Sequence, residues 1–178
     1  MDHDHTLTDL RLRFDDVLAK LESVAGWKTA RVRRPVLILG SLDGIETGVR
    51  QLIRETPLET EVVEIAGERL TVPTRAEMLR IKAVLIVKRN ATRDYLDFVA
   101  MSELIGRDAT LAALENFDGL YPQPNGQSVR QQLQVQLANP MPYDLDATNL
   151  AVYKKLKPEY QDWTVVAAKC REIANTLW

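Results

Sequence analysis

Charged residues between Ile81 and Phe98 are the first candidates for chemistry in this chain. Lys82 stands among apolar residues, and Arg89, Asp94 and Asp97 follow it. A buried charge without a partner is strongly unfavourable, so these side chains must either pair with one another or face a charged ligand. The stretch is therefore either an ion-paired structural hinge or part of a site.

Ordinary structural roles account for much of this pattern. Asp94 lies in the first turn of a predicted helix, where the helix dipole favours a carboxylate. Arg93 and Asp97 are four residues apart and are able to pair on the helix surface. The stem of Lys82 is expected to pack among apolar neighbours while its ammonium reaches water or a carboxylate. Both interpretations stay open from these residues alone.

Two predicted helices must position these charges. Thr74 and Glu77 have the S/T-x-x-E spacing of a capping box, which predicts a helix from there to Asn90. Thr92 is placed to cap a second helix that runs to Gly106. The remaining chain shows helical spacing interrupted by Pro- and Gly-containing loops.

The chain before Thr74 mixes one helix with about four strands. Apolar residues from Leu10 to Leu21 have helical spacing and precede Gly26, a typical stop signal. Asp43-Gly44 predicts a β-hairpin, and Ala66-Gly67 predicts the turn of a second extended pair. We therefore expect an α/β (α+β) fold with two domains, residues 1–73 and 74–178.

Composition limits the classes of partner. The 178 residues carry a net charge of −2, so nucleic acid would need a local basic patch. The arginines at positions 31, 33, 34 and 50 offer either such a patch or a solvated strand edge. Cys170 is the only cysteine, which excludes an internal disulfide. With no apolar run of ~18 residues, the expected location is cytoplasmic.

The segment "VPTRAEMLRIKAVLIVKRNATRDYLDFVAMSEL", residues 72–104, resembles the nucleotidyltransferase toxins of the AbiEii/AbiGii family. The resemblance implies a fold like DNA polymerase β, with a mixed β-sheet core followed by a C-terminal helical region. The family's first strand and its glycine-rich phosphate loop have no counterpart before Asp2. The resemblance therefore implies an N-terminally truncated member.

The resemblance also implies a site. Asp2 and Asp4 match the family's D-x-D strand and, with Glu46 as the third carboxylate, would bind Mg²⁺. Lys82 and Arg89 would hold the nucleotide, with Asp97 in support. The implied catalytic residues are Asp2, Asp4, Lys82 and Asp94.

The implied reaction is transfer of a nucleoside monophosphate from a nucleoside triphosphate to a tRNA, another RNA or a protein acceptor. Such a chain would act as the toxin of a toxin–antitoxin or abortive-infection system, with a cognate antitoxin and no membrane partner. The alternative is a truncated, catalytically inactive relative that acts as a binding or structural protein. Whether the chain is an enzyme stays open, as does a plain α/β domain unrelated to the family.

Overall fold

The computed structural model describes residues 3–153 and 156–177, and the chain divides into two compact units, Met1–Pro57 and Leu58–Trp178. The first unit holds a mixed β-sheet and the second is largely helical, which confirms the predicted α+β class. The division precedes the second extended pair, so that hairpin belongs to the helical unit and not to the sheet-bearing unit.

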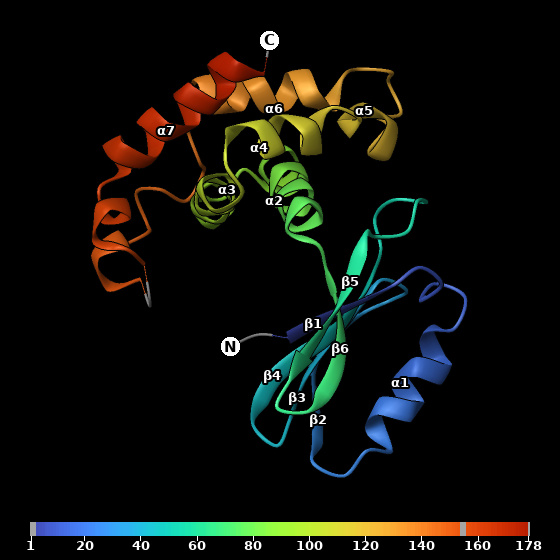
Figure 1. Ribbon diagram of the computed structural model, residues 1–178. Coiled ribbons are helices and arrows are strands. Elements are labelled where there is room, and N and C mark those ends of the chain that lie inside the picture. The colour runs from blue at the N-terminus through green and yellow to red at the C-terminus, as the bar shows by residue number, and fades with distance from the viewer. Residues whose placement is uncertain (1–2, 154–155, 178) are drawn as a thin grey trace. The chain divides into compact units, whose positions relative to one another are not determined.

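The first unit is a four-stranded sheet with one helix (Figure 1). Its elements are β1 (His3–Leu7), α1 (Phe14–Glu22), β2 (Trp27–Arg33), β3 (Leu37–Leu42) and β4 (Ile45–Gln51). The strand order is β1-β4-β3-β2, in which β1 runs parallel to β4 and the other neighbours are antiparallel. β1 and β2 are therefore the two edges of the sheet.

The small core of this unit lies between α1 and one sheet face. Leu10, Phe14, Ile38 and Val49 are buried there, and Trp27 packs against them. Leu10 lies in a turn before α1, so its helical spacing with Phe14 reflects burial on one side and not a continuous helix. The predicted hairpin at Asp43-Gly44 is confirmed, with positive φ at both residues as a type I′ turn requires.

The second unit begins with a two-stranded hairpin and continues as a set of helices. The hairpin pairs β5 (Thr60–Ile65) with β6 (Glu68–Pro73). The longer helices are α2 (Arg75–Arg89), α3 (Thr92–Ile105), α4 (Arg107–Leu114), α6 (Val129–Ala138) and α7 (Trp163–Thr176). Short turns complete the unit: α5 (Phe117–Leu120), η1 (Leu150–Val152) and η2 (Pro158–Gln161).

The ends of α2 and α3 follow the sequence signals with one exception. The Thr74 side chain accepts a hydrogen bond from Glu77 N, and Asn90 ends α2 in the left-handed conformation. Thr92, predicted to cap α3, is instead its first residue. Its backbone N–H and its hydroxyl both donate to Asp144 Oδ1, so a carboxylate from a distant loop performs the capping.

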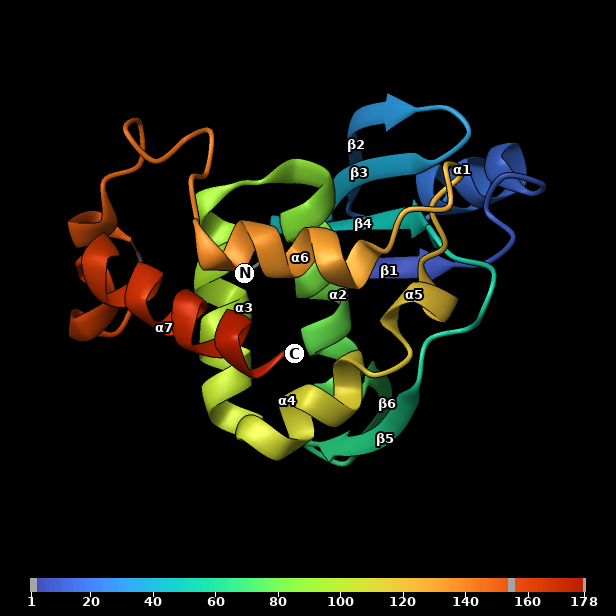
Figure 2. The ribbon, with the colours of Figure 1, turned by 90° about the horizontal axis from the view of Figure 1, so that it is seen from above.

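The helical unit has a larger core of its own. Its biggest fully buried side chains include Tyr95, Phe98 and Phe117. α6 packs against α2 and α7, and α7 also packs against α3 (Figure 2). Within the part of the chain that the structure describes, no helix has both the length and the apolar content needed to cross a membrane.

Candidate functional site

The charges of the lysine/aspartate motif pair with one another at the turn between α2 and α3. Arg89 forms two hydrogen bonds to Asp94, from Nε at 3.0 Å and from Nη2 at 2.5 Å. Lys82 Nζ donates to Asp97 Oδ2 at 2.8 Å. Asp94 is fully buried, and its hydrogen bond with Arg89 is the main reason that the pKa of Arg89 is raised.

The same turn is tied to a loop that follows α6. Asn90 donates from Nδ2 to the carbonyl of Met141, and its Oδ1 accepts from the buried Tyr95 hydroxyl at 2.6 Å. Burial favours the neutral carboxyl of Asp144, but its hydrogen bonds from Thr92 outweigh burial and lower the pKa of Asp144. These ion pairs and hydrogen bonds hold the start of α3 to α2 and to the loop that follows α6.

The other residues proposed for the nucleotide site lie in the first unit. Asp2 is outside the described residues. Asp4 lies in β1, where its backbone pairs opposite Gly48 of β4, and Glu46 is an exposed residue two positions before Gly48 in β4. The structure thus brings together Lys82 with Asp97 and Arg89 with Asp94, whereas Asp4 and Glu46 lie on adjacent strands of the other unit.

A metal centre is not formed by the residues that the structure describes. They include no group of three or more His, Cys, Asp or Glu side chains arranged to bind an ion. The expected Mg²⁺ site includes Asp2 and therefore stays a prediction. Cys170 is buried, which raises its pKa to about 12 and keeps it a neutral thiol.

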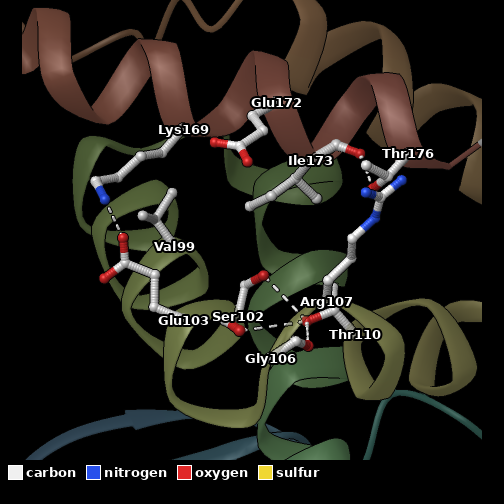
Figure 3. Close-up of a pocket in the computed structure, with 10 residues that line it drawn as sticks. All are labelled: Val99, Ser102, Glu103, Gly106, Arg107, Thr110, Lys169, Glu172, Ile173 and Thr176. Atoms are coloured by element: carbon white, nitrogen blue, oxygen red, sulfur yellow. Dashed lines mark hydrogen bonds and ion pairs between the residues drawn. The ribbon is translucent and has the colours of Figure 1, made fainter.

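A pocket of about 330 Å³ lies between α3, α4 and α7 (Figure 3). This volume is in the range of small-molecule sites. Two helices line it with residues spaced i, i+3, i+4 and i+7, which fall on one helix face. They are Val99, Ser102, Glu103 and Gly106 from α3 and its end, and Lys169, Glu172, Ile173 and Thr176 from α7.

Gly106 allows α3 and α4 to meet at this pocket. Its φ of +87° ends α3 and starts α4 within one residue, a conformation that glycine adopts readily. The turn brings Thr110 of α4 to Ser102 of α3, whose hydroxyl oxygens are 3.0 Å apart. Both residues are buried, so the pocket has a polar inner wall.

One side of the pocket is occupied by an ion pair. Glu103 accepts hydrogen bonds from Lys169 and from the Tyr160 hydroxyl. Burial would raise the pKa of Glu103, but these two donors outweigh burial and hold the pKa below its usual value. The hydrogen bond to Glu103 in turn raises the pKa of Lys169. The charges of Glu103 and Lys169 therefore neutralise each other.

Two further charges in the pocket are available to a ligand. Arg107 extends from α4 toward the end of α7, and Glu172 points from α7 into the pocket (Figure 3). Neither of these two side chains makes a hydrogen bond or an ion pair with another described residue. With the apolar surfaces of Val99 and Ile173 beside them, the arrangement suits a small amphiphile with a charged end.

Comparison with known proteins gives relatives of one kind. The haem uptake protein MmpL11 of Mycobacterium tuberculosis is 34% identical over 127 residues, which cover 70% of this chain and 13% of that protein. The mycolic acid-containing lipids exporter MmpL11 of Mycolicibacterium smegmatis is 33% identical over 128 residues, with the same coverage. The relatives are transport proteins. No family model and no solved structure matches the chain.

The names of these relatives correct the expected function. They describe haem uptake and lipid export, so they contradict a nucleotidyltransferase of a toxin–antitoxin or abortive-infection system. They equally contradict the expected partners: a nucleoside triphosphate, a tRNA or protein acceptor, and a cognate antitoxin. The chain spans only about an eighth of the length of these relatives. The roles predicted for individual residues are not tested by the matches: Asp2, Asp4, Glu46, Lys82, Arg89 and Asp94.

The pocket residues have no evident signal in the sequence. Ser102 and Thr110 are polar residues on otherwise buried helix faces, which hints at a polar contact but does not identify its partner. Lys169 and Glu172 lie more than sixty residues after Glu103. Only the packing of α7 against α3 brings these side chains to one place.

Proposed function

We propose that this chain is a ligand-binding module that serves lipid or haem transport. The observation that carries the proposal is its similarity, over 70% of its length, to one part of proteins named for haem uptake and lipid export. The pocket between α3, α4 and α7 supports it, because it combines apolar walls, buried hydroxyls and an available guanidinium. In this view the pocket binds the anionic end of an amphiphilic cargo.

The charges of the pocket make the proposal specific. Arg107 attracts a carboxylate and donates charge-assisted hydrogen bonds to it. Glu172 repels the same group from the opposite wall. Removing the charge of Arg107 should therefore weaken binding of the carboxylate, and removing the charge of Glu172 should strengthen it.

Titration of the purified chain with haemin and with palmitate tests the proposal. We expect saturable binding of one of them, about tenfold weaker in Arg107→Gln, since a hydrogen bond to a charged group contributes roughly 1.5–3 kcal/mol. Glu172→Gln should bind more tightly. Arg171→Gln, which removes an exposed charge outside the pocket, is the matched control. Absence of saturable binding to either compound, or equal affinity in Arg107→Gln, would overturn the proposal.

A further inference from the structure

The edge strand β2 carries an exposed row of cations. Lys28, Arg31 and Arg33 are all exposed. A regular strand would place Lys28 on the face opposite Arg31 and Arg33, since side chains alternate. The structure departs from that alternation between Thr29 and Arg31.

A β-bulge brings the three cations to one face. Lys28 pairs with Ser41 and Arg31 pairs with Leu39, so three steps along β2 match two steps along β3. Arg33 then pairs with Leu37. Because Leu37, Leu39 and Ser41 alternate along β3, they share a face, and their three cationic partners share it too.

This cationic face is the one turned away from α1. Ile38 and Val49 point to the core that α1 covers, so Leu37 and Leu39 belong to the opposite face. Both leucines are half-buried and stand beside the arginines of β2. Two acidic positions lie farther across the sheet: Glu46 opposite Ser41, and Asp4 of β1 opposite Gly48. The edge that faces solvent is therefore cationic with apolar residues just behind it.

We infer that the face formed by Lys28, Arg31, Arg33, Leu37 and Leu39 docks on an anionic lipid surface. The binding free energies of clustered cations add, so affinity for such a surface rises by about fivefold for each Lys or Arg near the headgroups. Charge complementarity favours this occupant, and so does the apolar surface beside the arginines, which acyl chains accept and a nucleic acid backbone does not. The similarity to transport proteins named for lipid export agrees with a lipid surface nearby. The inference stands apart from the pocket and runs against the expectation of no membrane partner, which no finding tests.

Vesicle co-sedimentation of the full chain tests the inference. We expect binding to vesicles of equal parts phosphatidylcholine and phosphatidylglycerol, release at high salt, and no binding to phosphatidylcholine alone. The variant Lys28→Gln/Arg31→Gln/Arg33→Gln should bind the anionic vesicles roughly a hundredfold more weakly. The matched control Arg69→Gln/Arg75→Gln/Arg171→Gln removes three exposed cations of the other unit and should bind as the parent chain does.

Three results would each overturn the inference. The first is absence of binding to the anionic vesicles at low salt, and the second is equal loss in the β2 variant and in the control variant. The third is loss of vesicle binding in Arg107→Gln with binding kept in the β2 variant, which would assign the lipid contact to the pocket. If the chain does not bind the vesicles but binds duplex DNA or RNA through the β2 face, the inference is also overturned, and the face is a nucleic-acid surface. Far-UV circular dichroism checks that each variant is folded.

Discussion

At the scale of single residues, burial of one partner decides how much an ion pair contributes to stability. Asp94 is fully buried and meets Arg89 through two hydrogen bonds. Arg93 approaches Asp97 only to 3.7 Å and is largely exposed. Exposed pairs contribute little to stability, whereas a buried carboxylate that loses its partner is strongly unfavourable.

Arg89→Ala should therefore destabilise the helical unit by roughly 2 kcal/mol or more, because it leaves the buried carboxylate of Asp94 without its guanidinium. Arg93→Ala should change stability by less than about 0.5 kcal/mol. Urea unfolding followed by circular dichroism measures both. Equal effects of the two substitutions would show that the Arg89–Asp94 pair does not stabilise the turn.

Burial also decides the reactivity of Cys170. Its thiol lies in the core of the helical unit, and burial raises its pKa to about 12. We expect no labelling by a thiol-specific reagent at pH 8 in the native chain, and complete labelling in urea, which serves as the control. Fast labelling without urea would mean that α7 opens locally far more often than its packing indicates.

At the scale of elements, α3 depends on a cap from outside its own sequence. Asp144 accepts from the backbone N–H and the hydroxyl of Thr92, so it binds the start of α3 from a loop 52 residues away. This contact joins the loop after α6 to the start of α3. A cap of this kind contributes about 1 kcal/mol, and more when it is partly buried.

Asp144→Ala should lower the free energy of unfolding by about 1–2 kcal/mol at pH 7. The pKa of Asp144 is below its ordinary value of 3.8, so this stabilisation is present above pH 3.8 and disappears as the pH falls through the lower value of the folded state. The difference between parent and variant should thus shrink only in strong acid. Asp146→Ala, at an exposed neighbour, is the control, and a constant difference down to the lowest pH would contradict the capping role.

At the scale of the whole molecule, the residues that the structure describes form two separate cores. One contains residues between Leu10 and Val49, and the other contains residues between Leu79 and Leu177. No described residue belongs to both. Each core lies within one of the two compact units.

Core truncations should consequently act within one unit. Ile38→Ala should raise hydrogen exchange in residues 3–57, and Leu133→Ala in residues 58–177, each costing roughly 2–5 kcal/mol locally. Mass spectrometry of the exchanged peptides measures both effects, with Leu12→Ala, an 89% exposed position, as the control. Exchange that rises equally in both units for either variant would show that the chain unfolds as one cooperative body.

The motif resemblance failed to predict the function for a physical reason. Spacing shows that Lys82, Arg89, Asp94 and Asp97 lie close along two helices, and they do. Spacing does not show whether such charges face a ligand or one another. Mutual pairing uses the same residue types at the same intervals, so the site interpretation and the structural interpretation are indistinguishable before the side chains are placed.

The sequence by itself determined the features that short-range contacts fix. The capping box at Thr74 and Glu77, the turn at Asp43-Gly44 and the helix end at Asn90 each depend on residues within a few positions of one another. The tertiary structure alone decided the cap from Asp144 and the pocket between α3 and α7. These require segments distant in the chain to meet, and their meeting is set by the packing of whole faces, which no local interval encodes.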